Sequence, residues 1–198
     1  GLAEAGVGYN FGPAQINLSV GKTWARQDLD LDGHIKADGT YFLAEALIPL
    51  TQNVWSTLGA YVNRGDVLVR RGYLNAGLPD HSSGRPDVTV EGLRARLDWE
   101  QALVLSDASI SPYVDLSHFR AKLDAYTESG GGFPARFDSR TEDTTELRLG
   151  LTAEKPLTGD MKLVGLVEGV HRFDESGVRT TGEIVGLFGF DIKGEDYR

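Results

Sequence analysis

Strict alternation of apolar and polar residues is the feature that most constrains this 198-residue chain. Such a period of two is the pattern of a β-strand with one apolar face, and no convincing amphipathic helix accompanies it. Nine segments show it and are our candidate strands. They are Gly1–Phe11, Gln15–Trp24, Thr40–Ile48, Trp55–Asn63, Val90–Leu103, Ile110–Tyr126, Thr145–Ala153, Lys162–Phe173 and Thr181–Ile192.

The connections between these strands alternate in length. Short ones cover Gly12–Ala14, Pro49–Asn53, Val104–Ser109 and Leu157–Asp160. Long polar ones cover Gln27–Gly39, Gly65–Asp87 and Thr127–Thr144, and only the short Asp174–Val178 connection departs from the alternation. Tight turns at one end and long loops at the other are typical of an antiparallel up-and-down transmembrane barrel.

The alternating rows admit two interpretations. In a membrane barrel the apolar row faces lipid and the polar row faces the lumen, whereas in a soluble barrel the apolar row faces a packed interior. The candidate strands reach ten or more residues, longer than the usual five to six, which favours the membrane. The alternative is a soluble β-barrel or sandwich that binds a small ligand, and an outer-membrane enzyme ranks third.

Charged residues occupy the polar rows of three candidate strands. Because they share one phase, opposite Leu97, Leu149 and Val167, we expect them to project to the same side and to line the lumen. They are Arg94, Arg96, Asp98, Glu100, Glu146, Arg148, Glu154, Glu168 and Arg172. Opposite charges in this set can pair across neighbouring strands.

Composition excludes several functional classes. The formal net charge of −9 argues against a nucleic-acid partner, because phosphate binding needs a basic surface. The absence of cysteine excludes disulfides, thiolate metal sites and thiol catalysis. No phosphate loop, nucleophile elbow or credible Ser–His–Asp order is present. We therefore expect no enzyme activity, no cofactor and no metal.

Three local features can be interpreted either as functional sites or as ordinary structural features. Asp28–Gly33 resembles the start of a calcium loop but lacks the closing Glu, so a solvated acidic loop is the simpler interpretation. Arg64–Asp66 is the Arg-Gly-Asp tripeptide at the start of an expected outward loop, and such short matches are common by chance. Lys22 interrupts an apolar row; either a bulge at Gly21 turns it inward, or the strand is placed lower than we assumed.

An ordered series of motifs resembles the C-terminal β-domain of bacterial autotransporters. It begins with SPYVDLSHFRAKLDAYTESGG (Ser111–Gly131), continues with TELRLGLTAE (Thr145–Glu154), and ends with VEGVHRF (Val167–Phe173). The Gly-rich strand, short turn and Asp-rich loop of Gly1–Asp32 also fit, so the resemblance covers essentially the whole chain.

The resemblance implies a closed twelve-stranded barrel in the bacterial outer membrane, of which residues 1–198 form one domain. The nine candidate strands correspond to the second through tenth, so we expect the domain to be incomplete at both ends, or completed by another chain. The family's role implies three partners: outer-membrane lipid, the protein's own N-terminal passenger, and the barrel assembly machinery. The implied function is export and surface display of that passenger.

Overall fold

The computed structural model describes residues 1–174, 177 and 179–194, and every regular element in them is a β-strand. In chain order the strands are β1 (Leu2–Phe11), β2 (Ala14–Asp28), β3 (His34–Pro49), β4 (Val54–Asn75), β5 (Leu78–Gly84), β6 (Asp87–Trp99), β7 (Leu103–Leu105), β8 (Ala108–Leu123), β9 (Tyr126–Thr127), β10 (Ala135–Phe137), β11 (Arg140–Pro156), β12 (Lys162–Arg172), β13 (Arg179–Ile184) and β14 (Phe188–Lys193). Across these ranges no helix is long and apolar enough to cross a membrane.

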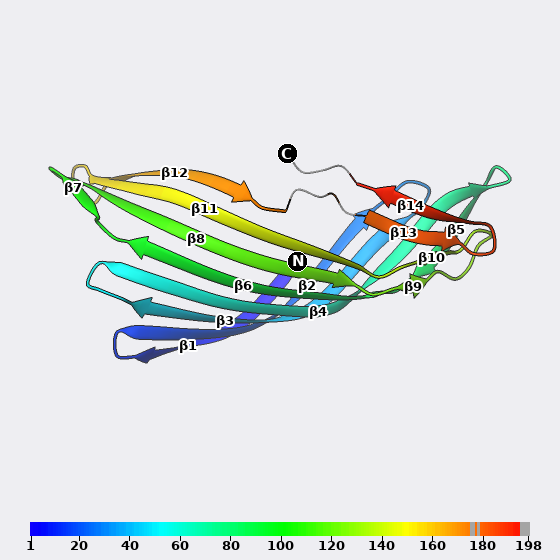
Figure 1. Ribbon diagram of the computed structural model, residues 1–198, viewed down its shortest axis with the longest axis horizontal. Coiled ribbons are helices and arrows are strands. Elements are labelled where there is room, and N and C mark those ends of the chain that lie inside the picture. The colour runs from blue at the N-terminus through cyan, green and yellow to red at the C-terminus, as the bar shows by residue number, and fades with distance from the viewer. Residues whose placement is uncertain (175–176, 178, 195–198) are drawn as a thin grey trace.

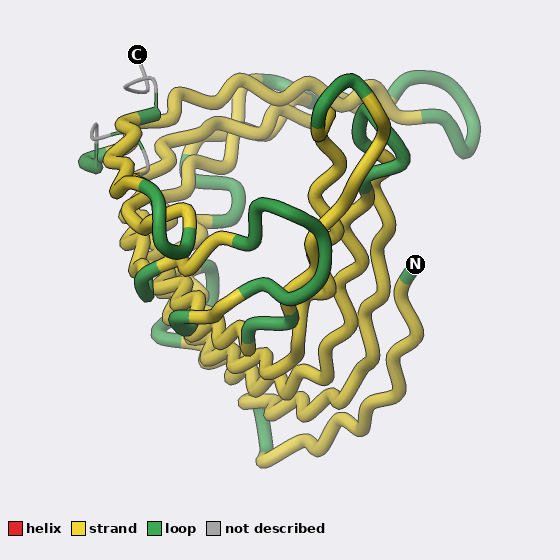
Figure 2. The backbone as a smooth tube through the Cα atoms, turned by 90° about the vertical axis from the view of Figure 1, so that its right-hand side faces the viewer, coloured by secondary structure: helices red, strands yellow, loops and turns green. Residues whose placement is uncertain are grey.

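Eight long strands form one curved antiparallel wall. Their spatial order is β1-β2-β3-β4-β6-β8-β11-β12, with β5 beside the outer part of β4 and β7 beside the start of β8 (Figure 1). Each wall strand pairs with the next one along this path, which confirms the up-and-down topology predicted from the connections. Figure 2 shows that the wall is an open arc, and within the described residues β1 pairs only with β2 and β12 only with β11.

The short and long connections lie at opposite ends, as predicted. The tight turns after β1, β3 and β11 share one end, and the connections after β2, β4 and β8 share the other (Figure 1). At the second end β14, β13, β10 and β9 form a separate four-stranded sheet. A bridge joins Ser83 of β5 to Ser129, which follows β9 by two residues. We call β5, β9, β10, β13 and β14 the collar.

Two sequence-based strand boundaries are wrong. The ninth candidate strand, Thr181–Ile192, is a hairpin of β13 and β14 in the collar, because Gly186 adopts a φ of 77° and reverses the chain. The wall therefore has eight strands rather than nine. The candidate strand Val90–Leu103 ends at Trp99, and Gln101 turns the chain with a φ of 50° before β7 begins.

The predicted long loops are largely strand. β4 runs for 22 residues and continues to Asn75, well into the Gly65–Asp87 segment. Similarly, β2 and β3 leave only residues 29–33 between them, and β11 begins at Arg140. The alternation weakens in these segments because apolar residues occur on both faces there, as at Val67, Leu68 and Val69 of β4. Of the Asp174–Val178 connection, residues 175, 176 and 178 lie outside the described residues, as do the final four residues of the chain.

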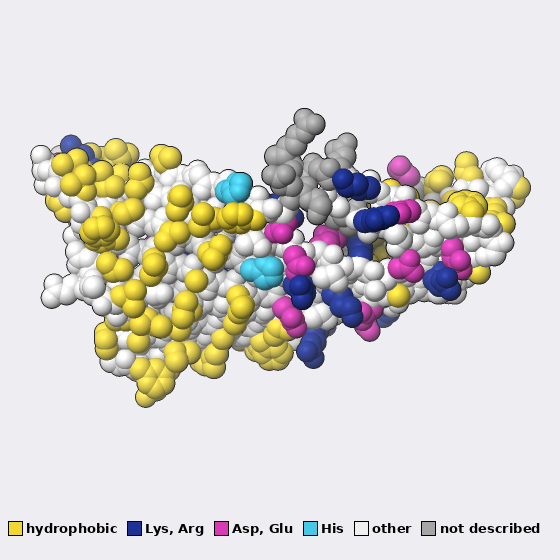
Figure 3. Space-filling view, in the orientation of Figure 1, with side chains coloured by type: hydrophobic (Ala, Val, Ile, Leu, Met, Phe, Trp, Pro, Cys, Tyr) yellow, Lys and Arg dark blue, Asp and Glu magenta, His cyan; other side chains and the backbone are white. Residues whose placement is uncertain are grey.

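The two faces of the wall differ sharply. The convex face, turned toward the viewer in Figure 3, carries exposed apolar side chains over the half nearest the tight turns. Leu93, Leu149 and Val167 are 63%, 56% and 73% exposed there. The concave face carries the more buried polar groups, including Asp115 at 4% and Tyr113 at 8% exposure. A folded chain that buries its polar face and exposes its apolar face has the arrangement of a membrane barrel wall.

Candidate functional site

Strand register places eight of the nine predicted lumen residues on the concave face. Arg94 aligns with Ser117, Glu146 and Arg172 across β6, β8, β11 and β12. Two neighbouring rows place the others on that side. They are Arg96–Asp115–Arg148 and Asp98–Tyr113–Gly150–Glu168, with Glu154 further along β11. Directly paired residues point to the same face of a sheet, so all eight residues project from the concave face.

Glu100 is the exception. It lies in the exposed turn that follows β6, where its backbone N–H donates to the carbonyl of Asn53 at 2.7 Å. The expectation that Glu100 continues the charged row was wrong, because β6 ends at Trp99 and the alternation does not persist through a turn.

Asp115 is the centre of the charged cluster, although the sequence-based set omitted it. The Arg94 guanidinium donates to both of its carboxylate oxygens, with Nε 3.0 Å from each. Arg96 Nη1 lies 3.8 Å from the same carboxylate, and its Nε donates to Asp98 at 2.8 Å. The alternation of Tyr113, Asp115 and Ser117 against Val114 and Leu116 was the signal that would have found it.

A second group of ion pairs extends the cluster to β12. Arg148 donates to Glu146 at 2.9 Å and to Glu168 at 3.3 Å. The Arg96 guanidinium lies 3.9 Å from the centroid of the Tyr113 ring, within reach of a cation–π contact. The tyrosine hydroxyl in turn donates to Glu168. Four neighbouring strands thus share one network of alternating charge.

The remaining predicted residues lie at the margins of this network. Glu154 accepts two hydrogen bonds of 3.1 Å from Lys162 near the tight turns, and Arg172 donates to Thr144 at 3.0 Å. The concave face of β12 is partly apolar. Val164, Leu166 and Val170 lie in the same row as Glu168 and are each more than half exposed.

The concave face of the first strands is polar but mostly uncharged. Tyr41 lies across Gly21 on β2 and donates to Glu4 on β1. This repeats the arrangement at the other edge, where Tyr113 lies across Gly150 on β11 and reaches Glu168 on β12. Each tyrosine spans three strands, and each glycine leaves the space that its ring occupies.

Lys22 lies at the rim of the convex apolar band, not within it. β2 pairs continuously with β1 and β3 through this position, so the bulge that would turn Lys22 inward is absent from these strands. Lys22 shares a row with Thr40, Arg64, Thr89 and Lys122. The neighbouring row toward the tight turns begins with Val20, Phe42 and Val62. A lysine at such an interface costs only about 0–1 kcal/mol.

Other sequence motifs do not form sites. Arg64–Asp66 lies inside β4 and pairs with β3 and β6 on both sides, so the expectation of an outward loop is wrong. Asp28 pairs with Arg26 at 2.8 Å. Among residues 1–174, 177 and 179–194, no three His, Asp or Glu side chains gather closely enough to hold a metal ion. His118 lies on the convex face and contacts Thr145 at 2.9 Å.

The arrangement offers a wet, mixed-charge wall rather than a reaction centre. The side chains of Arg94, Arg96 and Arg148 are between 27% and 43% exposed, so water reaches the network. Their charges are balanced by nearby carboxylates. The charged network has no strong net charge, and it suits the lining of an aqueous space.

Comparison with known proteins agrees with this arrangement. A family model described as the autotransporter β-domain matches residues 2–197. The chain belongs to the autotransporter β-domain family. That domain is a transmembrane β-barrel with an outer-membrane translocator role, rather than an enzyme domain. The sequence-based assignment of family and fold class is therefore confirmed.

A curated relative from Pseudomonas putida is described as an uncharacterized protein in the trpE–trpG intergenic region. It is 25% identical to the autotransporter domain over 204 residues, which include 94% of this chain. The alignment covers 33% of the relative, so the chain spans about a third of that protein's length.

Proposed function

We propose that this autotransporter domain forms part of an outer-membrane barrel that exports a passenger and anchors it at the cell surface. The passenger is a segment of the same protein on the N-terminal side of the domain. One observation carries the proposal: the mixed-charge network of β6, β8, β11 and β12 lies on the concave face, directly behind the exposed apolar convex face.

The two faces divide the work. The convex apolar side chains contact lipid, where a charged side chain would cost about 2–4 kcal/mol at the bilayer midplane. The concave network presents paired charges and water to an extended passenger segment in transit. Because the charges are already satisfied by one another, they do not hold the segment at a fixed position. This is what a conduit requires of its wall.

The open edges of β1 and β12 need partners in a membrane. Their outward N–H and C=O groups have no strand beside them among the described residues, and unsatisfied backbone groups cost several kcal/mol each in hydrocarbon. We propose that further strands close the barrel between β1 and β12, and that the cell's barrel assembly machinery inserts it. The collar then lies on the extracellular side.

Cysteine labelling in the full-length protein tests the orientation. Residues 1–198 contain no native cysteine, so Ala76→Cys in the β4–β5 turn and Thr158→Cys in the β11–β12 turn each place a single cysteine in the domain, at an exposed site. On intact cells, a membrane-impermeant maleimide should label the first variant and not the second. Equal labelling of both variants would contradict the topology.

Passenger display is tested separately. The N-terminal passenger should be digested by protease added to intact cells, whereas it should be protected when β12 is deleted and the wall is broken. A passenger that reaches the surface equally well without β12 would overturn the conduit role. Protein that purifies without detergent as a monomer would instead support the soluble-barrel alternative.

A further inference from the structure

A groove runs along the convex face across β2, β3, β4 and β6. Two hollows form it, of about 680 and about 540 Å³. They share Ala44, Ala60, Leu93 and His118, so they are parts of one continuous depression. A groove of this size on a surface that faces lipid accommodates a flexible chain of methylene groups.

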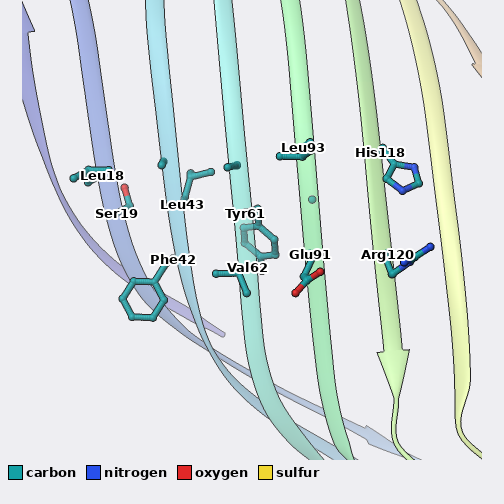
Figure 4. Close-up of a pocket in the computed structure, with 13 residues that line it drawn as sticks. Leu18, Ser19, Phe42, Leu43, Tyr61, Val62, Glu91, Leu93, His118 and Arg120 are labelled. Atoms are coloured by element: carbon teal, nitrogen blue, oxygen red, sulfur yellow. The ribbon is translucent and has the colours of Figure 1, made fainter.

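Small side chains create the groove. Strand register aligns Leu18, Ala44, Ala60 and Leu93 in one row, so two alanines form a floor between two leucines. Ala46 extends the floor in the next row, between Ile16 and Leu58. Figure 4 shows Leu18 and Leu93 on separate strands at the two sides, with Phe42 and Val62 further toward the collar. Leu18 and Leu93 are 53% and 63% exposed, so the residues that the structure describes leave these walls uncovered.

Cations lie at the collar end of the groove. Immediately beyond Phe42 and Val62, the next row holds Lys22, Thr40 and Arg64 on the same face. All three side chains are exposed, and neither Lys22 nor Arg64 forms an ion pair in the part of the chain that the structure describes. The two cations are two strands apart, which corresponds to about 9–10 Å. Thr40 adds a hydroxyl donor between them.

The cations of the rim on β8 differ from Lys22 and Arg64, because each of them pairs with a carboxylate. On β8 and β11, Arg120 donates to Asp143 at 2.7 Å, and Glu91 is the direct partner of Arg120 on β6. Lys122 pairs with Asp124 at 2.7 Å. The cations of the rim that form ion pairs therefore lie on β8. Lys22 and Arg64, on β2 and β4, lie over the collar end of the alanine-floored groove, and Asp38 and Asp66 follow them in the next row outward.

We propose that this groove is a binding site for an anionic membrane lipid. An acyl chain lies over Ala44 and Ala60 between Leu18 and Leu93, and the phosphate of the headgroup is bound by Lys22, Thr40 and Arg64. The apolar groove and the cationic row match the two parts of such a lipid in chemistry and in order along the strand. The inference rests on the proposed membrane placement of the domain and adds a specific lipid site to it.

The test uses the full-length protein reconstituted in vesicles of phosphatidylcholine containing phosphatidylglycerol, and measures retained lipid by native mass spectrometry. Wild type should retain phosphatidylglycerol in preference to phosphatidylcholine. Each cation near a membrane surface contributes about five-fold in binding, so Lys22→Gln or Arg64→Gln should lower retention about five-fold, and the double variant more. Lys36→Gln is the matched control, because Lys36 lies on the same face beyond the row and should leave retention unchanged.

A second variant tests the groove without changing charge. Ala60→Phe fills the floor and should reduce retention while Lys22 and Arg64 remain in place. An excess of inorganic phosphate should not displace the lipid, since the groove supplies part of the binding. Displacement by phosphate alone would show a simple anion site and would overturn the acyl-chain assignment.

The remaining outcomes separate this inference from the proposed function. If wild type inserts and displays its passenger but the double variant keeps its phosphatidylglycerol, the lipid site is wrong and the conduit stands. If wild type does not insert into vesicles at all, both are overturned. Equal retention of phosphatidylcholine and phosphatidylglycerol by wild type would also refute the site.

Discussion

The ring of Tyr113 occupies the space above Gly150, its direct partner on the neighbouring strand. A Cβ atom at Gly150 would lie 2.2 Å from the ring, which no real contact permits. The ring is 8% exposed, and its hydroxyl donates to Glu168 one strand further on. This one contact therefore ties β8, β11 and β12 together, next to the open edge of the wall.

The first prediction follows from that contact. Gly150→Ala should displace the Tyr113 ring and break its hydrogen bond to Glu168, lowering the free energy of unfolding by about 1–3 kcal/mol. The measurement is the urea midpoint of the protein folded in phospholipid vesicles. Gly59→Ala is the control, because its added Cβ would meet Arg94 Cβ at 3.6 Å and Glu45 Cγ at 4.0 Å, which are ordinary contact distances. Equal loss in both variants would contradict the role of the ring.

The second prediction concerns the convex face. Leu97 is 43% exposed there, in a row with Val114 and Leu149. Leu97→Arg should impair assembly by about 2–4 kcal/mol if this row lies near the bilayer midplane. Assembly is measured as the fraction with heat-modifiable gel mobility, and Leu97→Met is the control.

A spin label at residue 97 distinguishes lipid contact from burial in a soluble core. In vesicles it should be readily accessible to an apolar quencher such as oxygen and poorly accessible to a polar one. A label at Arg94, on the opposite face, should show the reverse preference. Reversal of the two results would mean that the faces are assigned the wrong way round.

The third prediction concerns the collar. The Glu128 side chain is fully buried and accepts hydrogen bonds from Arg71 at 2.6 Å and from the Ala135 N–H at 2.9 Å. Arg71→Met leaves this buried carboxylate without its cation, which costs about 3–5 kcal/mol. The segment between β8 and β11 should then detach from β4 and β5, and its amides should exchange hydrogen faster.

Arg85→Met is the matched control for the collar. Its ion pair with Asp66 is 3.4 Å long, and the Arg85 side chain is 64% exposed, so its loss should change exchange very little. We expect the wall strands to fold without the Arg71–Glu128 pair. Both variants should therefore keep the change in gel mobility on heating that marks a folded barrel. Unfolding of the whole domain by Arg71→Met would show that the collar is not a separable unit.

Much of this architecture was predictable from the sequence because membrane strands obey one simple rule. Leu93, Leu97 and Leu149 alternate with charged residues or glycine, and lipid on one side with water on the other enforces that period. The rule ends where the membrane ends. Beyond Arg64 one face of β4 packs on the collar, where Arg71 pairs with Glu128, so the alternation fades although the strand continues to Asn75.

A charged network on one face of the wall was predictable from the sequence, but the exact residues that form it were not. The charges of β6 and β11 were evident from their rows, whereas Asp115 was missed because its neighbours in the polar row of β8, Tyr113 and Ser117, are uncharged. Glu100 was wrongly included, since only the φ of Gln101 reveals the turn after Trp99. The groove over Ala44 and Ala60 depends on which strands are neighbours and in what register, and a period of two contains no information about either.

The last prediction is a pH dependence in the collar. The carboxylate of Asp80 accepts hydrogen bonds from Asn75 Nδ2 at 3.0 Å, the Gly132 N–H at 2.9 Å and the His81 N–H at 2.8 Å. These donors favour the charged form, with Asn75 the strongest, and hold the pKa of Asp80 below its usual value. A folded-state pKa below the unfolded value means that the bonds stabilise the collar at neutral pH, and that this contribution disappears as the pH falls through the unfolded and then the folded pKa.

Docking of the Gly132 segment should therefore be constant from pH 7 down to about 5 and should weaken progressively below about pH 4, near the ordinary pKa of an aspartate. Hydrogen exchange at the Gly132 amide, corrected for the intrinsic pH dependence of exchange, measures this loss. Asp80→Asn keeps an acceptor oxygen but has no titrating charge, so it should weaken docking at pH 7 and flatten the pH profile. An Asp80→Asn variant that keeps the wild-type pH profile would refute the role of Asp80 in the acid sensitivity.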